Sequence, residues 1–96
     1  MLEILVRNEK PQPRGWEFEV TLLSATDRQV HQVSLSCADY DLWCHGRTAP
    51  EMVVRAAVRF LLAREPATAI PARFDCAVLR RRFPHADQEL PGYLGE

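Results

Sequence analysis

Cysteine and histidine are the side chains of this sequence that most readily bind metals or act as nucleophiles, and the chain has three of each. Cys37, Cys44 and His45 are close in the sequence, and His31 precedes them. Zinc sites often use cysteine pairs separated by about two to four residues, whereas six residues separate Cys37 from Cys44. Cys37 also continues an apolar alternation, which suits a buried thiol. The spacing therefore predicts no metal site.

Covalent or acid–base catalysis has no clear pattern to support it. A cysteine nucleophile would need Cys44 or Cys76 within hydrogen-bond reach of a histidine, and no spacing fixes such a pair. Glu17 and Glu19 share a strand face, but paired carboxylates on a wet face are usually just solvated. The glycine-rich nucleotide motifs, G-x-S-x-G and H-E-x-x-H are missing from the sequence. The sequence therefore predicts a protein that is not an enzyme and uses no cofactor.

Arginine gives the strongest charge pattern. Residues 52–82 contain seven arginines against Glu65 and Asp75, a local excess of +5 within a chain of net charge -1. Residues 84–96 contain three acidic residues and no lysine or arginine. A basic surface of this kind can contact an anion or a nucleic acid. The candidate contact residues are Arg55, Arg59, Arg80, Arg81 and Arg82.

The same arginines also have an ordinary structural interpretation. Arg55 and Arg59 follow Glu51 at i, i+4 spacing, which is typical of a solvated helix stripe. Residues 80–82 suit the negative end of a helix. The acidic tail could also fold over the basic segment. We therefore keep nucleic-acid binding as the alternative and do not favour it.

Three segments alternate between apolar and polar residues and predict strands. Residues 2–7 form the first, and residues 8–15, with two prolines and a glycine, predict a loop. Residues 16–24 and 29–36 alternate across a plausible turn, which predicts a hairpin with one face open to water.

Three helices are expected after the strands. Ser36 is a capping residue for a helix over 38–45 that ends at Gly46. Thr48 is the expected N-cap of a long helix over 49–65, closed by Pro66. Asp75 is the expected N-cap of a helix over 76–83. Most residues between 52 and 63 are apolar. The apolar arc around this helix is therefore wider than contact with one sheet requires.

These elements predict an α+β fold: a three-stranded antiparallel meander followed by three helices, with helix 49–65 packed on the sheet. The 96 residues are enough for a single domain, and residues 84–96 are expected to form an irregular tail. The absence of a leader pattern, of a long apolar run and of a dense cysteine framework predicts a cytoplasmic chain without membrane contact.

The order of motifs resembles an uncharacterised family of small single-domain bacterial proteins. The resemblance rests on the H-x-V-x-L strand at 31–35, the T-A-P-E-M-V-V helix start at 48–54, and the Phe74-Asp75 and Phe83-Pro84 pairs. That family has no assigned activity, so the resemblance implies no catalytic residue. A looser similarity links the Gly46 to Glu51 segment with HicB-like antitoxin domains. The strand that those domains have after the long helix is not predicted here.

The wide apolar arc of helix 49–65 predicts a second partner for this helix besides the sheet. The expected function is therefore non-catalytic and based on protein–protein contact or self-association, with a homo-oligomer or another protein as partner. The alternative is a nucleic-acid-binding or antitoxin-like regulator that uses the arginine-rich region 52–82.

Overall fold

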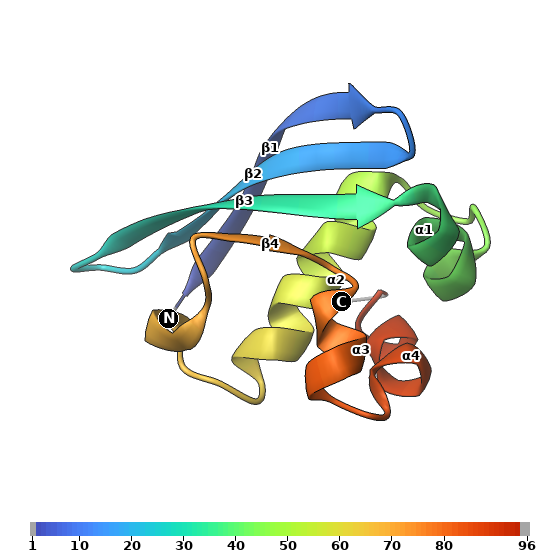
Figure 1. The fold of residues 1–96 in the computed structure, drawn as a ribbon. Coiled ribbons are helices and arrows are strands. Elements are labelled where there is room, and N and C mark those ends of the chain that lie inside the picture. The colour runs from blue at the N-terminus through green and yellow to red at the C-terminus, as the bar shows by residue number, and fades with distance from the viewer. Residues whose placement is uncertain (1, 95–96) are drawn as a thin grey trace.

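The computed structural model describes residues 2–94, in which four strands form one sheet and the helices lie on one of its faces (Figure 1). The elements are β1 (Glu3–Gln12), β2 (Gly15–Leu23), β3 (Arg28–Ser36), α1 (Cys37–Cys44), α2 (Pro50–Leu62), the 3-10 helix η1 (Ala67–Ala69), β4 (Arg73–Asp75), α3 (Val78–Arg82), α4 (Ala86–Glu89) and the 3-10 helix η2 (Leu90–Tyr93). The expected α+β class, with an antiparallel meander and helices packed on the sheet, is confirmed.

The central hairpin follows the alternation in the sequence. Strands β2 and β3 pair antiparallel from Gly15 opposite Ser36 to Leu23 opposite Arg28. The even-numbered residues of β2 from Phe18 to Leu22 are buried against the helices, as are Val33 and Leu35 of β3. The period-2 pattern thus sets which face of the hairpin enters the core.

The first strand is longer than the sequence predicts. Residues 8–12, expected to be a loop, continue β1 to Gln12. The register shifts between Arg7 and Lys10, where Asn8 has a φ of 57°. This irregularity interrupts the alternation, so the second half of β1 carries no strand pattern in the sequence.

The prediction of a three-stranded sheet is wrong, because a fourth strand, β4, pairs with β3 at the edge opposite β1. Strand β4 pairs with β3 in parallel, with Phe74 opposite Val33. Flanking hydrogen bonds join Gln32 N–H to the Ala72 carbonyl at 2.8 Å and Cys76 N–H to the Ser34 carbonyl at 2.9 Å. A three-residue strand is too short to show alternation, and its partner lies about 40 residues earlier in the chain.

The helix ends agree with the sequence only in part. Ser36 accepts a hydrogen bond from Asp39 N–H and caps α1, as expected. The long helix, expected over 49–65, is α2 at Pro50–Leu62, and its N-cap is Ala49 rather than Thr48. The helix expected over 76–83 is the shorter α3, capped at Ala77. Within residues 2–94, no helix is long and apolar enough to cross a bilayer.

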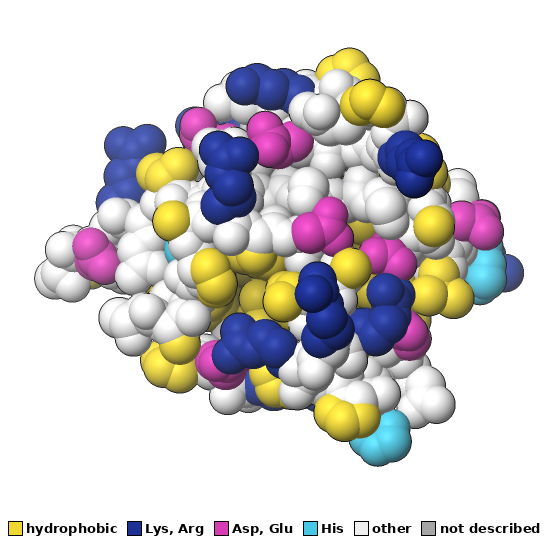
Figure 2. All heavy atoms as spheres, viewed as in Figure 1, with side chains coloured by type: hydrophobic (Ala, Val, Ile, Leu, Met, Phe, Trp, Pro, Cys, Tyr) yellow, Lys and Arg dark blue, Asp and Glu magenta, His cyan; other side chains and the backbone are white. Residues whose placement is uncertain are grey.

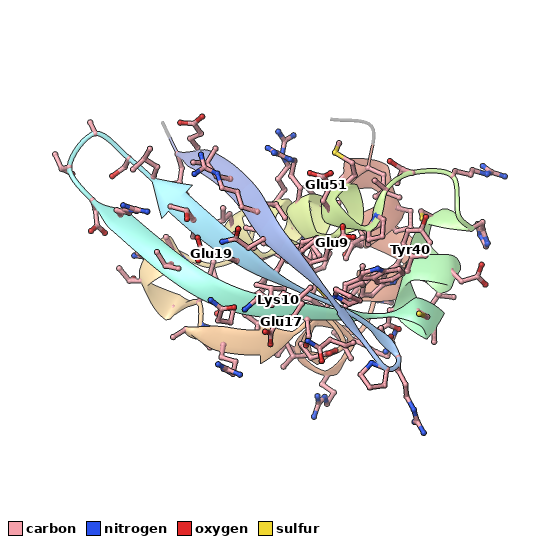
Figure 3. The ribbon with its side chains drawn as sticks, turned by 90° about the horizontal axis from the view of Figure 1, so that it is seen from above. Glu9, Lys10, Glu17, Glu19, Tyr40 and Glu51 are labelled. Carbon is pink, nitrogen blue, oxygen red and sulfur yellow. The ribbon has the colours of Figure 1, made fainter. Side chains whose placement is uncertain are left out.

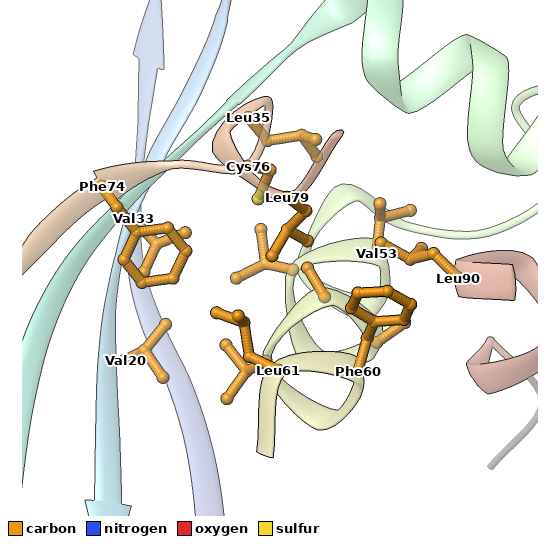
Figure 4. Packing of buried hydrophobic residues seen from close by; sticks show 14 of the residues in the cluster. Val20, Val33, Leu35, Val53, Phe60, Leu61, Phe74, Cys76, Leu79 and Leu90 are labelled. Atoms are coloured by element: carbon orange, nitrogen blue, oxygen red, sulfur yellow. The ribbon is translucent and has the colours of Figure 1, made fainter. Parts of the chain in front are cut away.

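The C-terminal segment covers the side of α2 that faces away from the sheet. Residues expected to be irregular form α4 and η2, with Ala86 and Leu90 fully buried. Figure 4 shows Leu90 near Val53 and Phe60 of α2, with Val20, Val33 and Phe74 of the strands on the opposite side. The wide apolar arc of α2 is therefore buried within one chain.

Candidate functional site

The five arginines predicted to contact an anion come from two helices, and three of them have different partners within the chain. Arg55 and Arg59 lie on α2, whereas Arg80, Arg81 and Arg82 belong to α3. The visible face in Figure 2 shows basic and acidic side chains next to one another rather than a continuous basic field.

Arg80 is the centre of a polar cluster that joins three helices. Its Nε and Nη2 donate to the two carboxylate oxygens of Asp87, at 2.9 and 3.0 Å. Its Nη2 also donates to Asp39 Oδ1 at 2.8 Å, and Trp43 Nε1–H donates to Asp87 Oδ1 at 2.9 Å. The hydrogen bonds from Arg80, helped by that from Trp43, lower the pKa of Asp87 against the opposing effect of burial. This guanidinium holds α1, α3 and α4 together.

The neighbouring arginines of α3 differ from each other. Arg82 pairs with Glu65, so the acidic residue just after α2 neutralises it. Arg81 is exposed to solvent. Of the three arginines in this run, Arg81 has the side chain best placed to meet an external anion.

Two further arginines of the basic segment are paired with carboxylates. Arg64 donates to Glu89 at 3.0 Å, and its guanidinium carbon lies 3.7 Å from the centroid of the Phe60 ring. Arg73 lies 4.0 Å from Glu17 on the open face of the sheet. The local excess of +5 seen in the sequence is thus offset in space by acidic residues from other segments.

A groove of about 910 Å³ lies between the beginning of β1 and the outer side of α2. It brings together Arg55 and Arg59, two of the predicted residues, with apolar side chains that the sequence did not single out. Its lining comes from Leu2 and the first residues of β1, Glu3 and Ile4, from residues 23–25 at the end of β2 and in the turn after it, from Arg55, Arg59 and Leu62 of α2, from Ala63 just after α2, and from Tyr93 of η2.

The edge strand β1 forms one wall of this groove. Among the described residues, the sheet order places β2 on one side of β1 and no strand on the other. Arg55 Nη1 donates to the Ile4 carbonyl at 2.9 Å, so this carbonyl points away from β2. A guanidinium has five N–H donors, and this bond uses one of them. The groove therefore combines a strand edge, apolar surface and a cation.

The cysteines and histidines are not gathered into a site. Cys37 is exposed, whereas Cys44 and Cys76 are buried, and burial raises the pKa of the Cys76 thiol. His31 is buried with Nδ1 2.7 Å from the Pro71 carbonyl oxygen. Over residues 2–94, no group of three or more Cys, His, Asp or Glu residues is arranged to hold a metal.

The paired carboxylates Glu17 and Glu19 lie on the open face of the sheet, as the alternation predicts. Figure 3 looks down on this face and shows Glu17 beside Lys10. In the strand register Lys10 is opposite Glu17, and Arg7 is opposite Glu19. Cross-strand pairs of opposite charge stabilise a sheet modestly, which gives these carboxylates a structural role.

Comparison of the chain with protein-family models, with curated proteins and with solved structures gives no match. The resemblance to an uncharacterised bacterial family and the similarity to HicB-like domains therefore stay predictions.

Proposed function

We propose that this chain is a non-catalytic interaction domain that binds a segment of a partner protein in the groove between β1 and α2. The observation that carries the proposal is the position of Arg55 beside apolar side chains at the beginning of β1, where its Nη1 donates to the Ile4 carbonyl. Apolar lining gives affinity, and a few placed polar groups give orientation. The size of the groove falls within the range of about 300–1,000 Å³ that is typical of ligand sites.

The charge of the groove favours an acidic segment. Arg55 lines it, and its bond to the Ile4 carbonyl uses one of the five N–H donors of the guanidinium. Arginine pairs well with carboxylates because its planar fork can donate two parallel hydrogen bonds. The bound segment is accordingly acidic with apolar residues between its carboxylates.

Self-association through the apolar arc of α2 was suggested by the width of that arc, and the arc is buried within one chain. Seven residues of α2 are buried, and the C-terminal segment supplies the second contact surface. The proposed partner therefore meets the groove rather than this arc.

Nucleic-acid binding has less support than a protein partner. Among residues 2–94, at least four of the seven arginines between residues 52 and 82 pair with carboxylates: Arg64, Arg73, Arg80 and Arg82. A patch neutralised in this way contributes little of the counterion release that drives binding to phosphates.

The test uses an acetylated, amidated hexapeptide of alternating valine and aspartate as probe, titrated into the ¹⁵N-labelled protein at low salt. We expect chemical-shift changes concentrated at residues 2–7 and 55–63. Arg55→Gln should weaken binding by about tenfold or more, as loss of a charge-assisted hydrogen bond implies. Arg47→Gln, at an exposed arginine outside the groove, is the matched control and should change little.

A hexapeptide with asparagine in place of aspartate controls for backbone and apolar contacts. If neither peptide shifts the groove resonances at concentrations on the order of 1 mM, the groove is not a site for such segments. Equal binding of both peptides would remove the assigned role of Arg55 as a carboxylate partner.

A further inference from the structure

We infer that the open face of the sheet is a self-association surface, on which a second copy of this chain packs face to face across a two-fold axis. The open face is the side of β1, β2 and β3 that is turned away from the helices (Figure 1). The inference does not rest on the proposed function, because it requires no segment in the groove.

The centre of the open face is a row of side chains that crosses three strands. The register places Leu5 of β1 opposite Thr21 of β2, and Thr21 opposite Val30 of β3. Opposite residues lie on the same face of a sheet, and the residues that alternate with these, such as Val20 and Leu22, are buried against the helices. Leu5 is half-buried and Val30 is 45% exposed, whereas Thr21 between them is buried. These three residues, here called the apolar row, therefore present little polar surface to water.

Charged residues lie on both sides of the apolar row, and along β1 their signs are opposite. Glu3, opposite Leu23, precedes the row, and Arg7, opposite Glu19, follows it. Figure 3 looks onto this face and shows Glu19. On its open side β1 therefore reads Glu3, Leu5, Arg7, with each charge about 7 Å along the strand from the apolar centre.

This order is complementary to itself when two strands run in opposite directions. A two-fold axis along the apolar row lays β1 of a second copy antiparallel over β1 of the first. Glu3 of each copy then faces Arg7 of the other, and the two apolar rows meet between these ion pairs. A closed two-fold interface uses the same patch on both partners, so a self-complementary pattern identifies a second copy as the occupant.

The other residues of the face agree with this axis and disfavour the second possible one. Rotation about the apolar row brings Arg28 over Gln32 and Glu19 over Leu23 of the second copy, so no like charges meet across these rows. Rotation about an axis along β2 would instead bring Glu19 over Glu19, and two facing carboxylates repel. Sheets that pack face to face keep their strands within about 30° of each other, and antiparallel stacking about the apolar row meets this condition.

The small size of the surface sets the strength of the dimer. The contact involves three short rows of side chains, less than the roughly 800 Å² per partner of a standard complex. We therefore expect a weak dimer in rapid exchange, with a dissociation constant on the order of 100 μM.

Charge reversal tests this pairing through sedimentation velocity of the full chain at low salt, from about 10 μM to 1 mM protein. We expect the parent to form a dimer as its concentration rises. Glu3→Arg and Arg7→Glu should each weaken the dimer by about tenfold or more, because both symmetry-related ion pairs become repulsive. An equimolar mixture of the two variants should dimerise as the parent does, since each reversed charge then faces an opposite one.

Two exposed residues outside the open face provide matched controls. Asp41→Arg and Arg47→Glu change the net charge by the same amounts as the two test variants and should change self-association little. Because Arg7 also lies opposite Glu19, urea unfolding checks that each variant folds. Recovery of the dimer in the mixture cannot come from altered folding, so the test holds even for a less stable variant.

Loss of the dimer in both single variants, with recovery in their mixture, is the result that supports the inference. A parent that sediments as a monomer up to about 1 mM contradicts it. A dimer that neither reversal weakens, or a mixture that stays monomeric, would show that Glu3 does not meet Arg7 and would overturn the inference. A dimer that is lost in Arg28→Glu but kept in Arg7→Glu would place the axis along β2 and contradict the arrangement as well.

Discussion

At the scale of single residues, chemistry-bearing side chains in this protein are used mainly to fix elements in place. Arg80 shows this most clearly, because one guanidinium bonds to carboxylates from two other helices. The sequence shows it as part of a run of three arginines, with no sign of its partners Asp39 and Asp87. Both carboxylates lie in segments that reach Arg80 only when the helices pack.

Asp87→Asn should reduce the free energy of unfolding by about 1–2 kcal/mol at neutral pH. This is the lower part of the range for charged hydrogen bonds, because the Asp87 side chain is 38% exposed to screening water. The pKa of Asp87 is lowered from its ordinary value of 3.8. Its contribution to stability is therefore present above that pH and disappears as the pH falls through the lowered value. Urea unfolding of both proteins at neutral pH and below pH 3.8 measures the difference.

The exposed Asp41 on α1 offers the matched control. Asp41→Asn should leave stability within about 0.5 kcal/mol of the parent. A difference between the parent and Asp87→Asn that stays constant into acid would contradict the ionic role of Asp87.

The three cysteines should differ sharply in reactivity. Cys37 is exposed at the start of α1, and we expect it to react readily with a thiol reagent in the folded protein. Cys76 is fully buried and its pKa is raised by burial, by Asp75 and by Asp39, so the thiolate that reacts is scarce. We expect one fast-reacting thiol in native conditions and three in denaturant. A Cys37→Ser variant that still shows a fast thiol would contradict this assignment.

At the scale of elements, the C-terminal segment departs most from expectation. Short helices α4 and η2 replace an irregular tail, because Leu90 and Tyr93 pack on Phe60 and its neighbours. The rings of Tyr93 and Phe83 meet Phe60 edge-on, with centroids 5.9 and 5.5 Å away. This segment is part of the single core.

Leu90→Ala should therefore destabilise the protein by about 2–5 kcal/mol, the cost of a cavity at a fully buried leucine. Thermal or urea unfolding followed by circular dichroism gives the value. Leu42→Ala is the matched control, because this leucine is 47% exposed and its loss should cost about 0.5 kcal/mol or less. Equal effects of the two changes would mean that the C-terminal segment is not held against α2.

At the scale of the whole molecule, charges that are separated in the sequence compensate each other in space. The acidic residues Glu17, Asp39, Glu65, Asp87 and Glu89 lie beside arginines of the basic segment. We expect no measurable binding to duplex DNA or single-stranded RNA in a filter-binding titration at low salt. Binding that falls steeply with salt and is lost in the Arg80/81/82→Ala variant would support the nucleic-acid alternative.

The Arg80/81/82→Ala variant needs a control for folding, since Arg80 holds three helices. Arg81→Ala alone removes an exposed charge without touching the Arg80 cluster. Loss of nucleic-acid binding in this single variant, with unchanged unfolding, would point to a genuine contact.

The sequence by itself determined the elements whose patterns are local and regular. The alternation of β2 and β3, the Ser36 cap of α1 and the apolar run of α2 are all visible along the chain. Each depends on a period or a cap that neighbouring residues supply, so no knowledge of distant segments is needed.

Only the tertiary structure decided the features that depend on residues far apart in the chain. Strand β4 forms because it can pair with the edge of β3. The outer side of α2 is covered because the chain folds back and places η2 against it. The same is true of the candidate site, where Arg55 of α2 meets the Ile4 carbonyl of β1 across 51 residues. A stripe of arginines in the sequence shows charge, but only packing brings that charge to a strand edge and makes a groove.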